Sequence, residues 1–295
     1  MIKIVLFILI SFIFNISFSQ DYESYYLLCN KADSLKFYGQ KLEALNTYKA
    51  AFQTVDFVHT EKLKKAYQLS IETSSFQEAF HFGKNIILNS GKTELVQTKS
   101  TDFKKSNYYK LLIDSNQFYL IDYNKRINRE YIEIIDSLFF VDQYIIRNNK
   151  SCKAEYKIDK NKLPKNLFDL DSSNWNLLYE SIKIWGFPSE ENVGYDTYKK
   201  VWLILHHNLR LIENEKYHSE IFEYVKRGDY LPEDLLVWYE QFQQQNYGQT
   251  FFTTWDGNLT NENLRRLEKN RRSFYLKGLD AYYLKKNGRY MQSKW

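Results

Sequence analysis

The sequence predicts a mainly α-helical protein of two modules that follow an export signal. Apolar residues recur at helical spacing along most of the chain after residue 20. A short motif near residue 44 returns 35 positions later. All six Trp and all three Pro lie at or after Pro164, and this shift in composition indicates a second module.

Residues 1–19 have the pattern of a signal peptide. Lys3 supplies a positive charge, an apolar run begins at Ile4, and small residues at 17–19 precede a cleavage site before Gln20. We expect a mature chain that is periplasmic or secreted, with no later membrane span. An uncleaved anchor is the alternative, because the run approaches the length that spans a bilayer. Cys29 lies too far past the apolar run for a lipoprotein.

Residues 20–126 resemble tetratricopeptide repeats. Small residues at Ala44 and Ala79 would let the two helices of a hairpin approach closely, and Tyr48 would fill the groove between repeats. The pattern Gly39-x-Lys41-x-x-Ala44-x-x-x-Tyr48-x-x-Ala51 returns as Ser74-x-Phe76-x-x-Ala79-x-x-x-Gly83-x-x-Ile86.

Only two such units are visible, whereas three or more usually bury a continuous core. The segment 102–120 would supply the missing layer, with Tyr109, Leu112 and Phe118 capping the stack. An unrelated antiparallel helical bundle is the alternative. A repeat module usually holds a peptide or helix on its concave face, so a protein or peptide is the partner expected here.

The second module, residues 127–290, begins with a mostly buried helix. Asp142 falls on its apolar stripe, and a buried carboxylate must be paired. Arg147 lies about 140° further around the helix, so it cannot meet Asp142 on one face, although it shares a face with Gln143. Each charge should therefore find its partner on another helix. The two residues are either members of structural ion pairs or part of a polar cleft.

A second helix spans residues 174–185, with Asp171 or Ser172 as its N-cap and Gly186-Phe187-Pro188 as its stop. The next helix, 195–211, is apolar nearly all round, which places His207 in or beside the core. Adjacent histidines diverge by about 100° on a helix, so His206-His207 is no bidentate metal pair. His207 is either a structural histidine or a general acid or base.

The remaining segments complete an all-helical protein. Helices are expected at 220–224, 231–242 and 259–276, with a short terminal helix to Lys286. Gln245-Asn246-Tyr247-Gly248 should form a loop after the second of these, and loops carry function more often than helix interiors.

Charge and cysteine content limit the other classes. The net charge is +5, but the densest basic cluster is interleaved with Glu262 and Glu268, which disfavours nucleic-acid binding. Cys29 and Cys152 could form one disulfide or remain two buried thiols. Their spacing does not match a metal site. No HExxH, GxSxG, P-loop or GxGxxG motif is present, so neither a metal nor a cofactor is expected.

Several short motifs along the last two thirds of the chain resemble, in this order, domain-of-unknown-function family 6624. The resemblance covers roughly residues 127–290. It implies an exported domain that is often paired with helical repeats, and it implies no particular reaction. The motif residues are Asp142-Gln143, Arg147, Asp171, Asn174, Gly186, Pro188, Gly194, His206-His207, Gln245 to Gly248, Asn270-Arg271-Arg272 and Gly278-Leu279.

The chain departs from the family pattern at three places. The family shows Asp-Arg before its Gln-x-Tyr-Gly-Thr loop, where this chain has Glu240-Gln241 and replaces the Thr with Gln249. Phe187 stands where the family has Trp. If the Asp-Arg pair carries an activity, this chain has lost it.

Two functions follow as hypotheses. The first is a binding or interaction protein of the bacterial cell envelope, which would act through the repeats. The second is a hydrolase-type enzyme whose site lies in the C-terminal module. In that hypothesis His207 acts as acid or base, and Arg147 holds an anionic group. The candidate residues of that site are Asp142, Arg147, His207, Gln245 and Tyr247.

Overall fold

The computed structural model describes residues 20–147, 167–208, 215–247, 261–273 and 275. Every element in these ranges is a helix, which confirms the all-α prediction. The helices are α2 (Tyr22–Phe37), α3 (Lys41–Phe52), α4 (Thr60–Glu72), α5 (Phe76–Ser90), the 3₁₀ turn η1 (Glu94–Val96), α6 (Thr101–Lys105), α7 (Asn107–Asp114), α8 (Asn116–Arg126), α9 (Arg129–Arg147), α10 (Leu167–Trp185), α11 (Glu190–His207), α12 (Glu215–Lys226), α13 (Pro232–Tyr247) and α14 (Asn261–Ser273).

The first two hairpins, α2–α3 and α4–α5, repeat the same local geometry. Gly39 in the first turn and Ser74 in the second both adopt a positive φ, +81° and +57°. Ala44 and Ala79 are fully buried at equivalent positions, as the motif predicts. The turns are closed by equivalent backbone hydrogen bonds, from Gln40 N to Leu35 O at 2.9 Å and from Ser75 N to Ser70 O at 2.8 Å.

The third layer of this module comes from α6 and α7. Leu112 is fully buried and packs over Gly83, where an added Cβ would lie 2.7 Å from Leu112 Cδ2. Gly83 therefore replaces the aromatic of the first unit because a leucine from α7 occupies that space. Tyr109 packs on Phe103 with ring centroids 5.3 Å apart. The expectation for Phe118 was wrong, because its side chain is 69% exposed on the outer side of α8.

Three element boundaries in the second module differ from the sequence prediction. Helix α10 begins at Leu167, so Asp171 and Ser172 lie inside the helix and are not its N-cap. Helix α11 begins earlier than expected, where Ser189 Oγ accepts a hydrogen bond from Asn192 N at 3.4 Å. Helix α13 continues to Tyr247, so the segment 245–247 is helical and not a loop.

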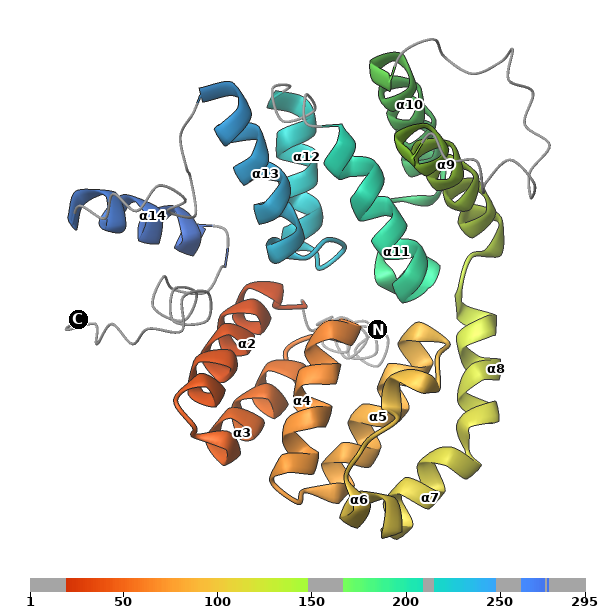
Figure 1. Cartoon of the computed structure of the whole chain (residues 1–295), viewed down its shortest axis with the longest axis vertical. Helices are drawn as coiled ribbons and strands as arrows, with labels where there is room; N and C mark the ends of the chain where they lie inside the picture. The colour runs from red at the N-terminus through yellow and green to blue at the C-terminus, as the bar shows by residue number, and fades with distance from the viewer. Residues whose placement is uncertain (1–19, 148–166, 209–214, 248–260, 274, 276–295) are drawn as a thin grey trace, which may run out of the picture.

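The second module covers the inner helices of the first. Figure 1 shows α6–α10 along one side of the molecule and α11–α13 returning above α2 and α4. Tyr26 on α2 donates its hydroxyl to Val225 O on α12 at 3.1 Å. The amide of Thr60 donates to Glu190 Oε1 on α11 at 2.9 Å. Lys62 on α4, with only 3% of its side chain exposed, is paired with Glu233 on α13.

One hydrophobic core therefore runs through both modules. It includes Tyr25 and Ile86 from the first module and Leu178, Val201 and Leu235 from the second. In an isolated repeat module, the inner helices α2 and α4 would line the concave face. Here α11–α13 of the same chain cover that face (Figure 1).

Cys29 is buried in this core and is a free thiol within the described residues, while Cys152 lies outside them. Burial raises the pKa of the Cys29 thiol to about 12. Among the described helices, none is both long enough and apolar enough to cross a membrane.

Candidate functional site

Helices α9 and α11 run parallel and in register, and this brings two of the candidate residues together. At the start of the pair, Asn128 N donates to Asn192 O at 2.8 Å. Two turns further on, Lys200 Nζ donates to Asp136 Oδ1 at 2.7 Å across a sequence separation of 64 residues. Asp142 and His207, which are in contact near the ends of the two helices, are 65 residues apart in the sequence. The register of the two helices therefore dictates this contact.

Asp142 and His207 form a short pair at the ends of these helices. The Asp142 side chain is fully buried, and His207 Nδ1 lies 2.9 Å from Oδ1 and 3.0 Å from Oδ2. Gln143 Nε2 donates to Asp142 Oδ2 at 2.9 Å. The buried carboxylate thus finds its partner on another helix, as the stripe of α9 predicts. The side chain of His207 remains 23% exposed, so one part of the ring reaches the surface.

This arrangement sets the tautomer of His207. An ionised carboxylate only accepts hydrogen bonds. The proton of the ring is therefore on Nδ1, which donates to Asp142, and Nε2 is the basic nitrogen. A histidine oriented by a carboxylate in this way is the usual form of a general base.

The neighbouring histidine has a different environment. His206 stacks on Trp202 with ring centroids 5.1 Å apart. Burial lowers the pKa of His206 below its ordinary value, and the charge of His207 lowers it further. Trp202 is itself held by a hydrogen bond from Nε1 to Asp234 O at 3.3 Å. His206 therefore packs beside α13 and takes no part in the contact with Asp142.

A further residue of the motif set supports the pair from α10. Asn174 is buried, with 3% of its surface exposed, and donates Nδ2 to Leu138 O at 3.3 Å. Leu138 lies one helical turn before Asp142 on α9. Asn174 therefore helps to fix α9 against α10 next to the buried carboxylate.

The other three candidates are placed only by their backbone. Arg147 is the last residue of α9, and Gln245 and Tyr247 lie in the last turn of α13. Their side chains lie outside the described residues, as do the side chain of Asp171 and both residues of Gly278-Leu279. The structure thus joins Asp142 and His207 and leaves the rest of the predicted set as a prediction.

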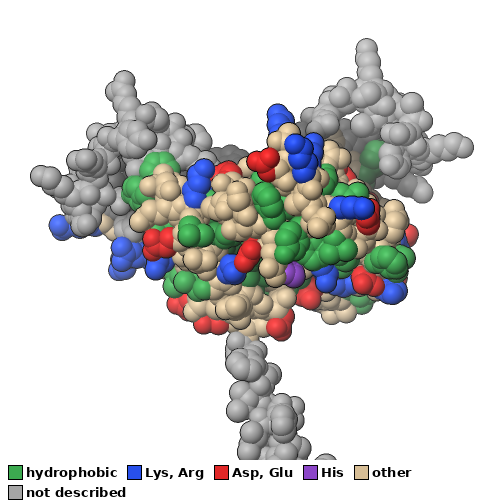
Figure 2. Space-filling view, turned by 90° about the horizontal axis from the view of Figure 1, so that it is seen from below, with side chains coloured by type: hydrophobic (Ala, Val, Ile, Leu, Met, Phe, Trp, Pro, Cys, Tyr) green, Lys and Arg blue, Asp and Glu red, His purple; other side chains and the backbone are tan. Residues whose placement is uncertain are grey.

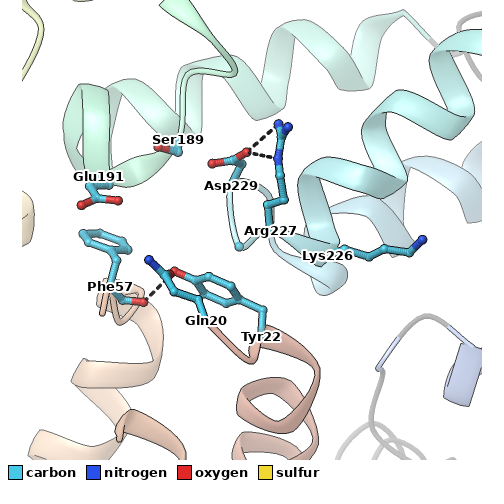
Figure 3. A pocket seen from close by; sticks show the side chains of 9 residues that line it. Gln20, Tyr22, Phe57, Ser189, Glu191, Lys226, Arg227 and Asp229 are labelled. Atoms are coloured by element: carbon cyan, nitrogen blue, oxygen red, sulfur yellow. Dashed lines mark hydrogen bonds and ion pairs between the residues drawn. The ribbon is translucent and has the colours of Figure 1, made fainter. Parts of the chain in front are cut away.

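Sequence reasoning missed a second polar region, where the two modules meet. His59 and Glu190 are both buried, with His59 Nδ1 3.5 Å from Glu190 Oε2. Beside them a cavity of about 460 Å³ opens to the surface (Figure 3). Its walls come from four places in the chain: Gln20 and Tyr22, Phe57, Ser189 and Glu191, and residues 226–229. No short-range spacing can indicate such a site, because Thr60 and Glu190, which are hydrogen-bonded there, lie 130 residues apart.

Within the described part of the chain, no group of three or more His, Cys, Asp or Glu side chains is placed to hold a metal ion. The chain matches none of the known family models, curated proteins or solved structures with which it was compared.

Proposed function

We propose that this chain is an exported enzyme of the hydrolase type whose acid–base group is the Asp142–His207 pair. The observation that carries the proposal is the 2.9 Å contact between a fully buried carboxylate and a histidine that still reaches the surface. A carboxylate with no exposed surface is costly unless it is paired. A buried aspartate that orients a partly exposed histidine is the arrangement that a general base uses.

In the proposed reaction His207 Nε2 removes a proton from water, and the resulting nucleophile attacks an electrophilic carbon or phosphorus of the substrate. Asp142 stabilises the imidazolium that forms, without itself taking the proton. The same nitrogen then returns the proton to the leaving group. Arg147, Gln245 and Tyr247 remain the proposed substrate-binding residues on the strength of the sequence motifs, and Arg147 lies five residues after Asp142 on α9.

The first experiment determines which ring nitrogen of His207 carries the proton, before any activity is assayed. In the ¹⁵N-labelled mature protein, the ring of His207 should show a protonated Nδ1 and an unprotonated Nε2 at neutral pH. Asp142→Asn should redistribute the proton toward Nε2. A His207 ring that carries its proton on Nε2 in the wild type would overturn the proposed role.

The matching activity test is a panel of chromogenic ester, amide, phosphoester and glycoside substrates. Any activity found should fall by about 10²-fold or more in His207→Gln and in Asp142→Asn. His206→Gln is the matched control, since His206 stacks on Trp202 and does not contact Asp142. Equal loss in all three variants would point to damage of the fold and not to a catalytic pair.

Export and family membership are parts of the same proposal. The segment 1–19 supports export, and N-terminal analysis of the purified protein should find a chain that begins at Gln20. The motif residues support membership of domain-of-unknown-function family 6624. Several of the motif residues, among them Asp142, Asn174 and Arg271, are buried polar side chains.

A binding protein of the cell envelope is the second candidate. The face of α2 and α4 that faces α11–α13 is already covered, so a partner would use another surface. The turn of the first hairpin offers one, since Phe37, Tyr38 and Leu42 are 36%, 58% and 62% exposed. On the face seen from below, hydrophobic side chains gather among charges of both signs (Figure 2).

A pull-down from envelope extract tests this second candidate with the full mature chain as bait. A protein captured by the wild type should be lost with the double variant Tyr38→Ser/Leu42→Ser. Phe118→Ser, which removes an apolar side chain that is 69% exposed on α8, is the control. Capture that is unchanged in the double variant would rule out this surface.

A further inference from the structure

The cavity between the two modules is lined by a carboxylate, Glu191, and by an ion pair, Arg227 with Asp229. Glu191 stands at the start of α11, and Arg227 and Asp229 stand on the turn between α12 and α13 (Figure 3). The side chain of Gln20 closes the side that belongs to the first module. The side chain of Lys226 points away from this space and pairs with Glu223 at 2.6 Å.

The charged groups of the lining retain capacity to bind. Arg126 holds the carbonyl oxygen of Glu191 at 2.6 Å, while the Glu191 carboxylate takes no hydrogen bond within the described residues. Arg227 donates Nε to Asp229 Oδ2 at 3.0 Å, and one terminal nitrogen lies 2.9 Å from the same oxygen in an ion pair. Those bonds use one edge of a guanidinium that has five N–H donors. Arg227 is also 58% exposed, so its other edge can meet a ligand.

Behind two of the cavity-lining rings lie buried polar groups that do not line the cavity and make no hydrogen bond. Both ring nitrogens of His59, Glu190 Oε2 and the Thr60 hydroxyl are buried without a hydrogen bond within the described residues. The His59 ring packs on two cavity-lining rings, at 5.8 Å from Phe57 and 6.4 Å from Tyr22. Unsatisfied buried polar groups are rare in folded proteins and are typical of functional sites.

We propose that this cavity binds a free amino acid, with its ammonium group at Glu191 and its carboxylate at Arg227. Glu191 offers a carboxylate to an ammonium group, and the exposed edge of Arg227 that Asp229 leaves unused offers donors to a carboxylate, so a ligand that carries both charges fits the lining. An Arg side chain recognises a carboxylate with particular strength. The volume is within the range of small-molecule sites, and such sites are common between domains.

The cavity is separate from the Asp142–His207 pair. The two lie at opposite ends of α11, which spans Glu190 to His207. Helix α11 is kinked at Gly194, and the stretch from Tyr195 to His207 alone, at a rise of 1.5 Å per residue, spans roughly 18 Å. The proposal does not rest on the proposed hydrolase activity, and either can fail while the other stands.

Calorimetry and thermal melting of the full mature chain with each free L-amino acid test the proposal. At least one amino acid should bind with one-to-one stoichiometry and raise the melting temperature, because a ligand that touches both modules stabilises the folded state. The N-acetylated and the C-amidated forms of that amino acid should each bind at least tenfold more weakly.

Three variants locate the binding. Glu191→Gln and Arg227→Gln should each weaken binding at least tenfold, and Lys226→Gln should leave it unchanged. Glu191 is exposed and makes no side-chain hydrogen bond, so Glu191→Gln remains informative even if the loss of Arg227 disturbs Asp229. Four outcomes overturn the proposal: no amino acid binds, an uncharged sugar binds in its place, the N-acetylated or amidated form binds equally well, or Glu191→Gln binds as the wild type does.

Discussion

Two carboxylates of the second module show how the surroundings of a buried acid decide its chemistry. Asp142 has a histidine and an amide at its oxygens. Asp234, in the first turn of α13, has the hydroxyl of Tyr198 at 2.8 Å. Burial raises the pKa of Asp234 from 3.8 to about 6, the Tyr198 hydrogen bond opposes that rise, and the charge of Glu233 adds to it. The fold therefore disfavours the ionised form of Asp234.

This shift predicts a pH dependence of stability. Between pH 3.8 and about 6 the folded chain retains a proton on Asp234 that the unfolded chain has released. The contribution of this group to the free energy of unfolding therefore falls as the pH rises through that window. At about 1.4 kcal/mol per pKa unit, the loss is roughly 3 kcal/mol.

Asp234→Asn keeps an oxygen that accepts from Tyr198 and removes the charge. In urea unfolding from pH 4 to pH 7, the free energy of unfolding of the variant should increase relative to that of the wild type as the pH rises. A difference in stability that stays constant over this range would contradict the assignment.

The Asp142–His207 pair makes a second prediction at the same scale. Removal of His207 leaves a fully buried carboxylate with only Gln143 beside it, which should cost about 3–5 kcal/mol. The cost should be smaller when Asp142 is already Asn. A double-mutant cycle of Asp142→Asn and His207→Gln, read by chemical denaturation, should give a coupling energy of about 1–3 kcal/mol.

The Asp136–Lys200 pair on the same two helices is the matched control for this cycle. Its side chains are 46% and 30% exposed, so their coupling should stay below about 1 kcal/mol. Equal coupling in both pairs would mean that burial of Asp142 adds nothing to the contact.

At the residue scale the sequence predicts which side chains need partners better than it predicts the partners. The apolar stripe of α9 shows that Asp142 is buried and must be paired. It does not show that the partner is His207, because that follows from the register of α9 against α11. The sequence does not single out Glu191, Arg227 and His59, since they come from three separate segments and no local spacing relates them.

At the scale of elements, the turn before α13 is a point of tight packing. Gly228 has a φ of +81°, and an added Cβ would lie 2.1 to 2.4 Å from three ring atoms of the buried Tyr22. Gly39 has the same φ of +81° with no atom within 4 Å of such a Cβ. The two glycines therefore separate the cost of the backbone conformation from the cost of the contact.

Gly228→Ala should destabilise the protein by roughly 2–4 kcal/mol, the sum of a left-handed residue and an overpacked ring. Gly39→Ala should cost only about 1–2 kcal/mol. Thermal melts of the two variants measure the difference directly. If both variants melt at the same temperature, the contact between Gly228 and Tyr22 is not tight.

The sequence predicts where most elements lie and fails mainly at their ends. Helical spacing correctly indicates α9 to α14, because each buries an apolar face. Gln245 to Tyr247 were placed in a loop because polar residues there carry no apolar periodicity, yet the helix continues through them. The sequence predicts that Phe118 caps the repeat stack together with Tyr109 and Leu112. The structure exposes its side chain, because none of the described helices covers that side of α8.

At the scale of the whole molecule, the two modules share one core and should unfold together. Calorimetry should show one transition whose calorimetric and van't Hoff enthalpies agree. A fragment of residues 20–126 would expose Tyr22, Tyr26 and Lys62, which are buried in the full chain. It should therefore bind a hydrophobic dye such as ANS, and the full chain should not. Two separate transitions in the full chain would show that the modules are independent.

One hydrogen bond joins residues that are far apart in the sequence, and this affects how the chain folds in the cell. The acceptor of the Tyr26 hydroxyl, Val225 O, lies 199 residues further along the chain, so it is synthesised much later. Ribosomes add about 5–20 residues per second, so α2 is complete roughly 10–40 s before α12 exists. In an exported chain, the surface of Tyr26 that α12 covers stays exposed until translocation has delivered both helices. A chaperone that holds the chain unfolded until export is complete should therefore reduce its aggregation.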